Sequence, residues 1–493
     1  MDLSSEAIEE IVKRAIFTIQ QNPSAGTDAH AEALKPTIPV ALSQSSARHA
    51  SGELGVFDDV DDAVEAAWIA QRKWATEYKI DDRKIVIEAI RQCARAHVEE
   101  WCRKIVAETG MGRYEDKVEK HLATINKTPG PECLTTEAIS GDNGLMLEEY
   151  APFGVIAAIT PTTNPTETII NNSISMLSGA NTVVFNVHPR AKKVSADAVK
   201  ALNRAIIDAG GPENLITMTK EPTMENVDKL AANPKIRLMV GTGGMGMVNA
   251  LLHSGKKCIG AGAGNPPVIV DETADVELAG RKIYEGASFD NNILCFAEKE
   301  AFVVDSVYDG FLYNIKKAGA YHLSAAETEK LVSICFKKND KGAYVINKDW
   351  VGKNASEILK QIGVSVPDSC RLAVCEVTKD HPFVTVEQMM PIFPIVRVSS
   401  FEEAEQDAVE AEHGNRHTSS IFSKDVYHMT DFARKIETTI YVKNSCTKAG
   451  VGIGGEGHCT MTIAGPTGEG ITCAKSFCRK RRCMLADGGL RII

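Results

Sequence analysis

Residues 154–187, GVIAAITPTTNPTETIINNSISMLSGANTVVFNV, hold two apolar runs with a helical segment between them. The runs GVIAAIT and NTVVFNV are short and rich in β-branched residues, which is typical of buried strands. Between them, Ile170, Ile174 and Leu177 recur at helical spacing, and Pro165 stands where the first turn of a helix tolerates proline. The stretch therefore predicts a strand, a helix and a second strand, the unit from which parallel sheets are built.

The same alternation continues on the C-terminal side of this stretch. Apolar runs at 213–219, 236–241 and 256–262 are separated by amphipathic segments, and a second series of strands and helices runs from about 268 to 443. Helical patterns alone fill the residues from about 56 to 124. We therefore expect an α/β fold of two domains, each with a parallel sheet covered on both faces.

The N-terminal residues 1–19 are predicted to form an amphipathic helix that is separate from these domains. Its apolar stripe comprises Ile8, Ile11, Val12, Ala15 and Ile16. Residues 20–54 are rich in Ala, Ser, Pro and Thr and indicate a flexible linker. On these residues alone, a helix docked on its own subunit and a tag that offers its stripe to a partner are equally supported.

The composition is that of a reduced globular protein and excludes several classes of function. The chain has 493 residues and a net charge of -10, which argues against a nucleic-acid binder because phosphate binding needs a basic surface. Its 13 cysteines show no CxxC spacing, and no signal peptide precedes them, which indicates a cytosolic protein without a zinc site. No apolar run has the length needed to span a membrane, so we expect no membrane partner. Because the cysteines match no zinc-ligand spacing, we also expect no metal.

A glycine motif at residues 241–246 is the best candidate for a nucleotide site. GTGGMG follows an apolar run and opens a helix, so the backbone of Gly241, Thr242, Gly243 and Gly244 could approach a diphosphate at a helix N-terminus. The acidic residue expected about 20 positions later for the ribose is absent. Two overlapping matches between 450 and 457 lack the strand and helix that the motif requires. The alternative is a glycine turn that only packs a helix on a strand.

Several longer motifs resemble one family. They are ETGMG at 108–112, ITPTTNPTETIINNSIS at 159–175, SGKKCIGAGAGNPPVIVDETAD at 254–275, GASFDNNILCFAEK at 286–299, VKN at 442–444, and GIGGEG and PTGEG near the end. The chain is similar to the aldehyde dehydrogenase superfamily, and within it to the CoA-acylating acetaldehyde and propionaldehyde dehydrogenases of ethanolamine- and propanediol-utilising bacteria. The resemblance implies an aldehyde dehydrogenase-like fold, with a Rossmann-like nucleotide-binding domain, an α/β catalytic domain and a small oligomerisation element. The implied division is a targeting helix at 1–19, a linker at 20–54, a nucleotide-binding domain at 55–255 with an oligomerisation strand at about 142–152, a catalytic domain at 256–448, and a return segment with a C-terminal oligomerisation arm at 449–493.

The resemblance also implies the roles of individual residues. Cys295 falls on the nucleophile of the superfamily, and Asn164 on the amide that stabilises the negative oxygen of the thiohemiacetal. Without the resemblance, Asn164 before a proline would be interpreted as a turn residue. Glu387 falls on the acidic residue used for the nicotinamide ribose, although a surface residue at a strand start is an alternative. Further contacts to NAD are implied for Thr160, Pro161, Thr162, His188, Arg190, Gly241, Thr242, Gly243, Gly244 and Gly262.

The second half-reaction is predicted from a residue that is missing. Hydrolytic aldehyde dehydrogenases carry a glutamate at the start of the segment 259–266 to activate water, but here the segment reads IGAGAGNP. A thioester on Cys295 should then await the more acidic thiol of coenzyme A. The rivals are a hydrolytic enzyme that makes free acid and a non-catalytic compartment assembly protein. Arg416 replaces the first of the subfamily's paired histidines, while His417 is retained, which puts an acid-base role of this loop in doubt.

The resemblance predicts partners as well. We expect a short-chain aldehyde and coenzyme A as substrates, NAD as cofactor, and a homodimer or homotetramer. The N-terminal helix is expected to bind shell proteins of a bacterial microcompartment in the cytoplasm.

Overall fold

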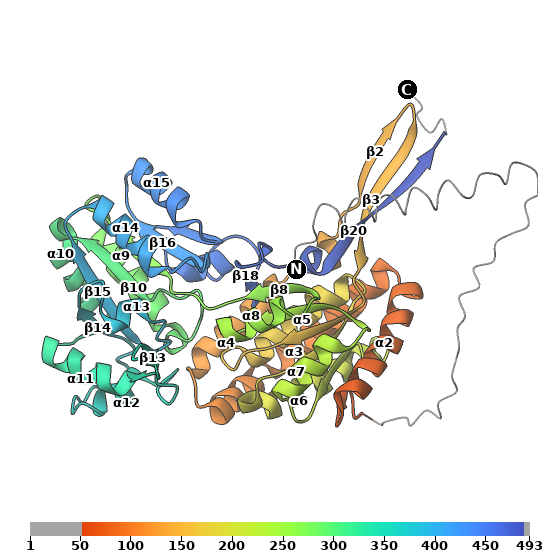
Figure 1. The fold of residues 1–493 in the computed structure, drawn as a ribbon, viewed down its shortest axis with the longest axis horizontal. Coiled ribbons are helices and arrows are strands. Elements are labelled where there is room, and N and C mark those ends of the chain that lie inside the picture. The colour runs from red at the N-terminus through yellow and green to blue at the C-terminus, as the bar shows by residue number, and fades with distance from the viewer. Residues whose placement is uncertain (1–51, 488–493) are drawn as a thin grey trace, which may run out of the picture. The chain divides into compact units, whose positions relative to one another are not determined.

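The computed structural model describes residues 52–487, and Figure 1 shows its elements. The predicted N-terminal helix and most of the linker lie outside the described residues. Two parallel sheets carry the body of the chain, and a third, antiparallel sheet is separate from them. The prediction of an α/β fold with two parallel sheets is confirmed.

The first sheet has six strands in the order β1-β6-β5-β4-β7-β8, all parallel. Its strands are β1 (Val56–Phe57), β4 (Val155–Ile159), β5 (Thr182–Asn186), β6 (Ile216–Thr219), β7 (Ile236–Thr242) and β8 (Lys257–Ala261). Its helices are α2 (Val60–Thr76), α3 (Ile80–Thr109), α4 (Tyr114–Lys127), α5 (Pro165–Ser178), α6 (Lys192–Asp208), α7 (Met224–Ala232) and α8 (Met245–Leu252), with the short turns η1 (Pro131–Cys133) and η2 (Pro189–Ala191).

Strand β4 shows why the apolar run predicted at 154–160 is continuous. Ile156 and Ala158 pack in the core that α3, α5 and α6 cover, whereas Val155 and Ala157 pack in the opposite core, which α2 and α7 cover. Successive side chains of a strand point to opposite faces, so a strand buried on both faces needs an apolar residue at every position.

The second sheet has seven parallel strands in the order β11-β14-β15-β10-β9-β16-β17. Its strands are β9 (Pro267–Val270), β10 (Glu300–Val304), β11 (Tyr321–His322), β14 (Ala373–Glu376), β15 (Ile392–Val398), β16 (Thr418–Phe422) and β17 (Ile440–Lys443). Its helices are α9 (Val276–Ser288), α10 (Asp305–Lys317), α11 (Ala325–Cys335), α12 (Ala355–Lys360), α13 (Pro382–Thr385), α14 (Phe401–Ala411) and α15 (Val426–Ile436), with the turns η3 (Phe289–Asn292) and η4 (Thr447–Val451). Helices α9 and α10 cover one face, and α14 and α15 cover the other.

One predicted boundary needs correction. Placing the start of the catalytic domain at residue 256 separates β8 from the first sheet, but β8 pairs with β7 from Lys257 to Ala261. The sequence pattern already placed 256–262 in the same alternation as 236–241, and consecutive strands of such a series usually pair in one sheet. The first sheet therefore extends to Ala261, and the chain passes to the second sheet in the glycine-rich segment that follows.

A third sheet, here called the antiparallel arm, has strands that, among the described residues, pair only with one another and not with the two parallel sheets. It consists of β2 (Glu137–Gly141), β3 (Gly144–Pro152) and β20 (Cys478–Ala486), with β3 in the centre. Two small hairpins, β12 (Phe336–Lys338) with β13 (Tyr344–Ile346) and β18 (Ile463–Ala464) with β19 (Gly470–Ile471), and the turn η5 (Ala474–Phe477) complete the described elements. Among the helices of residues 52–487, none is long and apolar enough to cross a membrane.

Candidate active site

The loop before Cys295 has an unusual backbone. Asp290, Asn291 and Asn292 all have positive φ angles, of 49°, 53° and 61°. Residues other than glycine rarely adopt this left-handed region, and Asp and Asn tolerate it better than most side chains. The acidic and amide residues ahead of the cysteine are therefore suited to a tight, strained turn that leads from α9 into the site.

Hydrogen bonds from neighbouring elements hold this turn in place. The Asp290 N–H donates to Asp116 Oδ2 of α4 at 2.8 Å. Asn292 Nδ2 donates to the carbonyl oxygens of Ala287 and Glu298, both at 2.8 Å. Strained backbone persists only where its surroundings over-determine it, and such positions cluster at functional sites.

The Cys295 thiol is half-buried, and its surroundings favour the protonated form. Burial, and then the nearby Glu387 carboxylate, raise the pKa of Cys295 to about 12, while the Lys299 and Lys120 ammonium groups act in the opposite direction. The thiolate is the nucleophilic form of cysteine. Cys295 in the free protein is therefore a thiol. It must lose its proton before it can act as a nucleophile.

This raised pKa predicts how the thiol reacts with an alkylating agent. Well below its pKa, the thiolate fraction of a cysteine rises about tenfold for each pH unit. We therefore expect the rate of inactivation of the free enzyme by iodoacetamide to increase about tenfold per unit from pH 7 to pH 9. Mass spectrometry of the modified peptide identifies the residue, and a rate that levels off below pH 8 would contradict the raised pKa.

Asn164 lies at the carboxyl edge of the first sheet. It follows β4, caps the N-terminus of α5 and is buried, with 6% of its surface exposed. Its carbonyl oxygen accepts from the Thr168 N–H at 3.1 Å, so the residue is part of a helix start as well as of the site. Its side-chain oxygen accepts a hydrogen bond from Lys120 Nζ at 2.6 Å.

The segment between β8 and β9 packs directly against the nucleophile. A Cβ atom on Gly264 would lie 2.4 Å from the Cys295 carbonyl oxygen, so only glycine allows this approach. The Gly264 N–H donates to the Glu387 carboxylate, whose pKa is raised, mainly by burial. Glu387 is half-buried beside Cys295 rather than on the surface. Residues 259–265 carry no carboxylate.

His417 packs against the same side of Gly264 as Cys295 does. A Cβ atom on Gly264 would be 2.9 Å from the His417 ring, and His417 Nδ1 hydrogen-bonds to Thr418 Oγ1 at 2.8 Å. Burial lowers the pKa of His417 to about 4, so the ring is neutral at neutral pH. Its Nε2 has no hydrogen-bond partner in the part of the chain that the structure describes. The retained histidine therefore lies next to the reacting centre.

The glycines of the 241–246 motif divide into two kinds. A Cβ atom on Gly241 would lie 2.5 Å from Leu251 Cδ1, so this glycine serves the packing of α8 on β7. Gly244 lies at the N-terminus of α8. A Cβ atom placed on Gly244 would have no other atom within 4 Å, so there is free space beside its backbone. The Thr242 hydroxyl pairs with Thr462 Oγ1 at 3.2 Å. The motif thus combines helix packing with an open backbone that fits a diphosphate.

The other predicted cofactor residues follow β4 and β5 at the same sheet edge. Thr160 Oγ1 is buried without a hydrogen-bond partner among residues 52–487, and Pro161 and Thr162 are half-buried. His188 Nδ1 accepts from the Arg190 N–H at 3.2 Å. Burial, and then the positive charges of Arg190 and Lys348, lower the pKa of His188. An orphaned hydroxyl and a positive edge are features that fit a nucleotide at the carboxyl ends of parallel strands.

Comparison with known proteins identifies the family. The model of the aldehyde dehydrogenase family matches residues 33–333. The chain belongs to this family. It is 43% identical over 487 residues to the acetylating acetaldehyde dehydrogenase EutE of Salmonella typhimurium, covering 98% of this chain and 99% of the relative.

Solved structures of similar enzymes agree with the fold. The propionaldehyde dehydrogenase of Rhodopseudomonas palustris, with bound CoA and an acylated cysteine, is 49% identical with a TM-score of 0.85, covering 88% of this chain and 98% of that one. The propionaldehyde dehydrogenase from the fucose utilisation bacterial microcompartment of Clostridium phytofermentans is 47% identical with a TM-score of 0.86, covering 89% and 100%. The predicted aldehyde dehydrogenase-like fold is confirmed.

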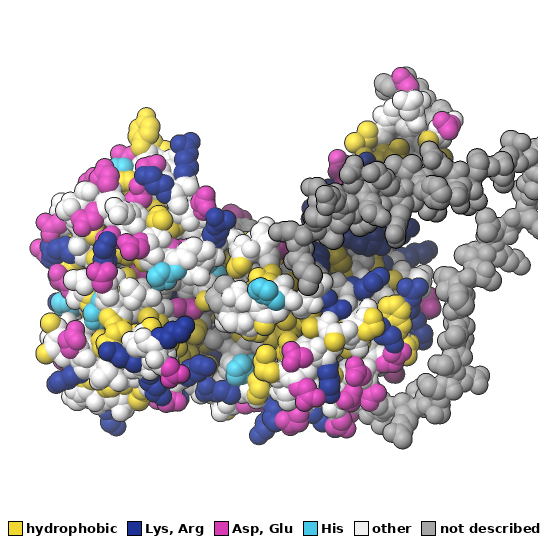
Figure 2. All heavy atoms as spheres, viewed as in Figure 1, with side chains coloured by type: hydrophobic (Ala, Val, Ile, Leu, Met, Phe, Trp, Pro, Cys, Tyr) yellow, Lys and Arg dark blue, Asp and Glu magenta, His cyan; other side chains and the backbone are white. Residues whose placement is uncertain are grey.

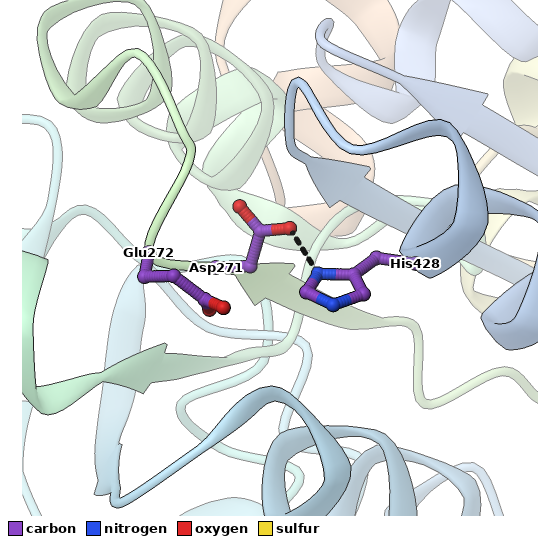
Figure 3. Close-up of side chains that lie close together, drawn as sticks. All are labelled: Asp271, Glu272 and His428. Carbon is purple, nitrogen blue, oxygen red and sulfur yellow. Dashed lines mark hydrogen bonds and ion pairs between the residues drawn. The ribbon is translucent and has the colours of Figure 1, made fainter.

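A second group of polar side chains in this aldehyde dehydrogenase lies outside the site. The ligand atoms of Asp271, Glu272 and His428 lie within 4.8 Å of one another (Figure 3). His428 Nδ1 hydrogen-bonds to Asp271 Oδ2 at 2.9 Å, and its ring stacks on Phe401 at 3.9 Å between centroids. Asp271 Oδ1 accepts from the N–H and hydroxyl of Thr273. These hydrogen bonds connect α15 to the end of β9, which gives the cluster a structural role.

Three charged residues of the aldehyde dehydrogenase site were missed by sequence reasoning. Lys117 and Lys120 of α4 are fully buried, and both contact Asp290 Oδ2, at 3.1 and 2.7 Å. Lys299 is also buried, and its Nζ donates to the carbonyl oxygens of Asn292 at 2.7 Å and Leu294 at 3.1 Å. Lysines in an amphipathic segment are usually interpreted as solvated, so no sequence pattern separated them from surface residues.

Proposed function

We propose that this aldehyde dehydrogenase oxidises a short-chain aldehyde, such as acetaldehyde or propanal, with NAD and transfers the acyl group to coenzyme A. The observation that carries the proposal is the segment 259–265, which packs against Cys295 through Gly264 and contains no carboxylate to activate water. The similarity to an acetylating acetaldehyde dehydrogenase and to a propionaldehyde dehydrogenase with bound CoA supports it.

Each residue of the site is proposed to have one role in the reaction. The partly exposed Cys295 thiol gives its proton to solvent and adds, as the thiolate, to the aldehyde carbonyl. The oxygen that becomes negative is stabilised by N–H donors from the Asn164 side chain and the Cys295 backbone. NAD, when bound, would supply the acceptor for the hydride that leaves this adduct. The product is a thioester on Cys295, which the thiol of coenzyme A attacks, and Cys295 leaves as a thiolate. We propose that the neutral His417 ring, whose Nε2 has no hydrogen-bond partner among the described residues, receives the proton of the incoming thiol.

We assign the NAD site to the carboxyl edge of the first sheet. The open backbone at Gly244 and the N-terminus of α8 support binding of the diphosphate. The orphaned Thr160 hydroxyl and the positive charge of Arg190 support contacts to the rest of the nucleotide. The remaining proposed contacts are Pro161, Thr162, His188, Gly241, Thr242, Gly243, Gly262 and Glu387.

The products distinguish this proposal from its rivals. With aldehyde, NAD and coenzyme A, we expect acyl-CoA and NADH in equal amounts, measured by chromatography and absorbance. Without coenzyme A, NADH should stop after about one equivalent per site, because the thioester is not hydrolysed. Free acid formed at the same rate with and without coenzyme A would favour the hydrolytic enzyme, and no NADH at all would favour a non-catalytic assembly protein.

We further infer that the protein is a homodimer or homotetramer that uses the antiparallel arm. Ile139 of β2 and Met484 and Leu485 of β20 are large apolar side chains that are 56%, 59% and 52% exposed. Figure 2 shows hydrophobic side chains on this arm. Exposed apolar side chains on a sheet favour burial against another chain.

The N-terminal residues are proposed to direct the enzyme into a bacterial microcompartment. Support comes from the apolar stripe of residues 1–19 and from the likeness to an enzyme of a fucose utilisation microcompartment. Deleting residues 1–19 is expected to leave activity within about twofold and to abolish co-purification with shell proteins, because helix-in-groove binding depends on the apolar anchors. Changing Ile11 and Ile16 to Glu should act like the deletion, and changing Glu9 and Lys13 to Gln should not. Unchanged shell association would place the signal elsewhere.

A further inference from the structure

Helix α4 turns a charged face toward the interior of the protein. Lys117 and Lys120 are three residues apart, on the same side of the helix, and both side chains are 0% exposed. Lysines are almost never fully buried unless they are paired. The contacts of these two residues therefore indicate what each of them does.

Lys120 connects the two halves of the active site. Its Nζ lies 2.7 Å from Asp290 Oδ2, in the strained turn before Cys295. On the other side it lies 2.6 Å from Asn164 Oδ1 and 3.0 Å from Glu167 Oε1, both at the start of α5. An ammonium group has three N–H donors. Those of Lys120 are used by Asp290 Oδ2, by Asn164 Oδ1 and, at 3.4 Å, by the Thr163 carbonyl oxygen, while Glu167 contributes an ion pair.

The contact with Lys120 determines which way the Asn164 carboxamide points. An ammonium group can only donate, so the atom of Asn164 that it contacts must be the oxygen. The Asn164 Nδ2 is then turned away from Lys120, and one of its two N–H groups donates to Thr163 Oγ1 at 3.2 Å. The second N–H is available for the oxygen of a substrate. A positive charge on the amide oxygen also polarises the amide and strengthens its N–H as a donor.

The charges around Lys120 are balanced. Asp290 and Glu167 provide two carboxylates for the two lysines, and all four side chains are fully buried. Although burial opposes its charge, the two carboxylates raise the pKa of Lys120, so its ammonium group stays protonated. Lys120 is also near enough to Cys295 for its charge to favour the thiolate.

We propose that Lys120 is a positioning residue for the reaction, which holds the Asn164 carboxamide with its N–H toward the substrate oxygen and ties it to the turn that carries Cys295. This inference rests on the proposed role of Asn164 in stabilising the negative oxygen. Lys120 is expected to act through Asn164 and not to contact the substrate.

Lys117 provides a matched control. It is equally buried, and its Nζ lies 3.1 Å from the same oxygen of Asp290. In the described part of the chain it makes no hydrogen bond to Asn164. Burial lowers the pKa of Lys117, whereas the pKa of Lys120 is raised, so the two lysines match in burial and in their contact with Asp290 and not in charge stability. Replacing either with methionine removes a buried partner of Asp290, but only the change at Lys120 releases the carboxamide.

The test is a double-mutant cycle on kcat for NADH formation at saturating aldehyde, NAD and coenzyme A. Lys120→Met is expected to lower kcat at least tenfold with the KM for the aldehyde within about threefold, because the oxyanion forms after binding. In an Asn164→Ala background, the same change should lower kcat by no more than about threefold, because only the weaker effect of the Lys120 charge on Cys295 remains. Lys117→Met should lower kcat by the same factor in both backgrounds, since its effect does not pass through Asn164.

Other results would overturn the proposal. If Lys120→Met lowers kcat equally with and without Asn164, the lysine acts only on the stability of the site. If Lys120→Met does not yield folded protein, Lys120→Arg takes its place, because it keeps the charge between Asp290 and Glu167 but replaces one ammonium nitrogen, which donates to several oxygens at once, with a planar fork of different geometry. A loss of at least tenfold with Asn164 and of no more than about threefold without it is then expected, and equal losses in both backgrounds again reject the role. NADH formation reports hydride transfer whether coenzyme A or water completes the cycle, so failure of the proposed product leaves this test intact.

Discussion

Cys295→Ala is expected to abolish NADH formation, to below about one part in ten thousand of the wild-type rate. In the proposed mechanism hydride leaves from the adduct on Cys295, and removal of a catalytic nucleophile commonly costs this much or more. The hydrogen bonds that hold the turn before Cys295 use the side chains of Asp290 and Asn292 and not the thiol, so the fold should be preserved. The absorbance of NADH measures turnover, and calorimetry with NAD measures cofactor binding. An unchanged melting temperature of the variant would show that its fold is preserved.

A second buried cysteine provides the control for this change. Cys335 lies in the core at the end of α11, outside the site, and burial also raises its pKa to about 12. Cys335→Ala should therefore reduce stability by about 1 kcal/mol, as small core truncations do, and leave kcat unchanged. Clear residual turnover of Cys295→Ala, with full NAD binding, would place the nucleophile at another residue.

Both parallel sheets could be predicted from the sequence because the information is local. In β4 every residue is apolar, since Ile156 and Val155 face two different cores, and such runs stand out between helices. Cys295 and Asn164 could be proposed from the sequence because each lies in a long motif with a family resemblance, and their roles stay predictions. By contrast, the boundary predicted at residue 256 is wrong although residues 256–262 show a strand pattern: β8 pairs with β7, the strand just before it in the same alternation, and so belongs to the first sheet.

The charged part of the site could not be predicted, and α4 shows why. Its sequence, YEDKVEKHLATINK, has the alternation of acidic and basic residues that is typical of a solvated helix. In the structure Asp116, Lys117, Lys120 and His121 are buried, because the partners of this face come from η3, α5 and Arg371 rather than from water. Buried polar groups need hydrogen-bond partners, and partners that are distant in sequence leave no trace in a local pattern.

Asn164→Ala is expected to lower kcat about 100-fold or more and to change the KM for the aldehyde little. Loss of one oxyanion donor in other enzymes costs about 100- to 1,000-fold, because the charge it stabilises develops only as the reaction proceeds. In the free protein the side-chain oxygen of Asn164 is held by Lys120 at 2.6 Å, so the donor is oriented before substrate arrives. Steady-state kinetics at varied aldehyde concentration separate the two parameters.

The control for this prediction lies on the same helix. Asn172 is buried in α5 and its Oδ1 accepts from Thr462 Oγ1 at 3.2 Å, but it belongs to the contact with the return segment. Asn172→Ala should lower the melting temperature, because it leaves a buried hydroxyl with one partner fewer, and should keep kcat within about threefold. Asn164→Asp has nearly the same shape as the native residue but replaces the donor with a second acceptor, so it should be at least as inactive as Asn164→Ala. A loss confined to the KM for the aldehyde would mean that Asn164 holds the substrate and does not stabilise the oxygen on which negative charge develops.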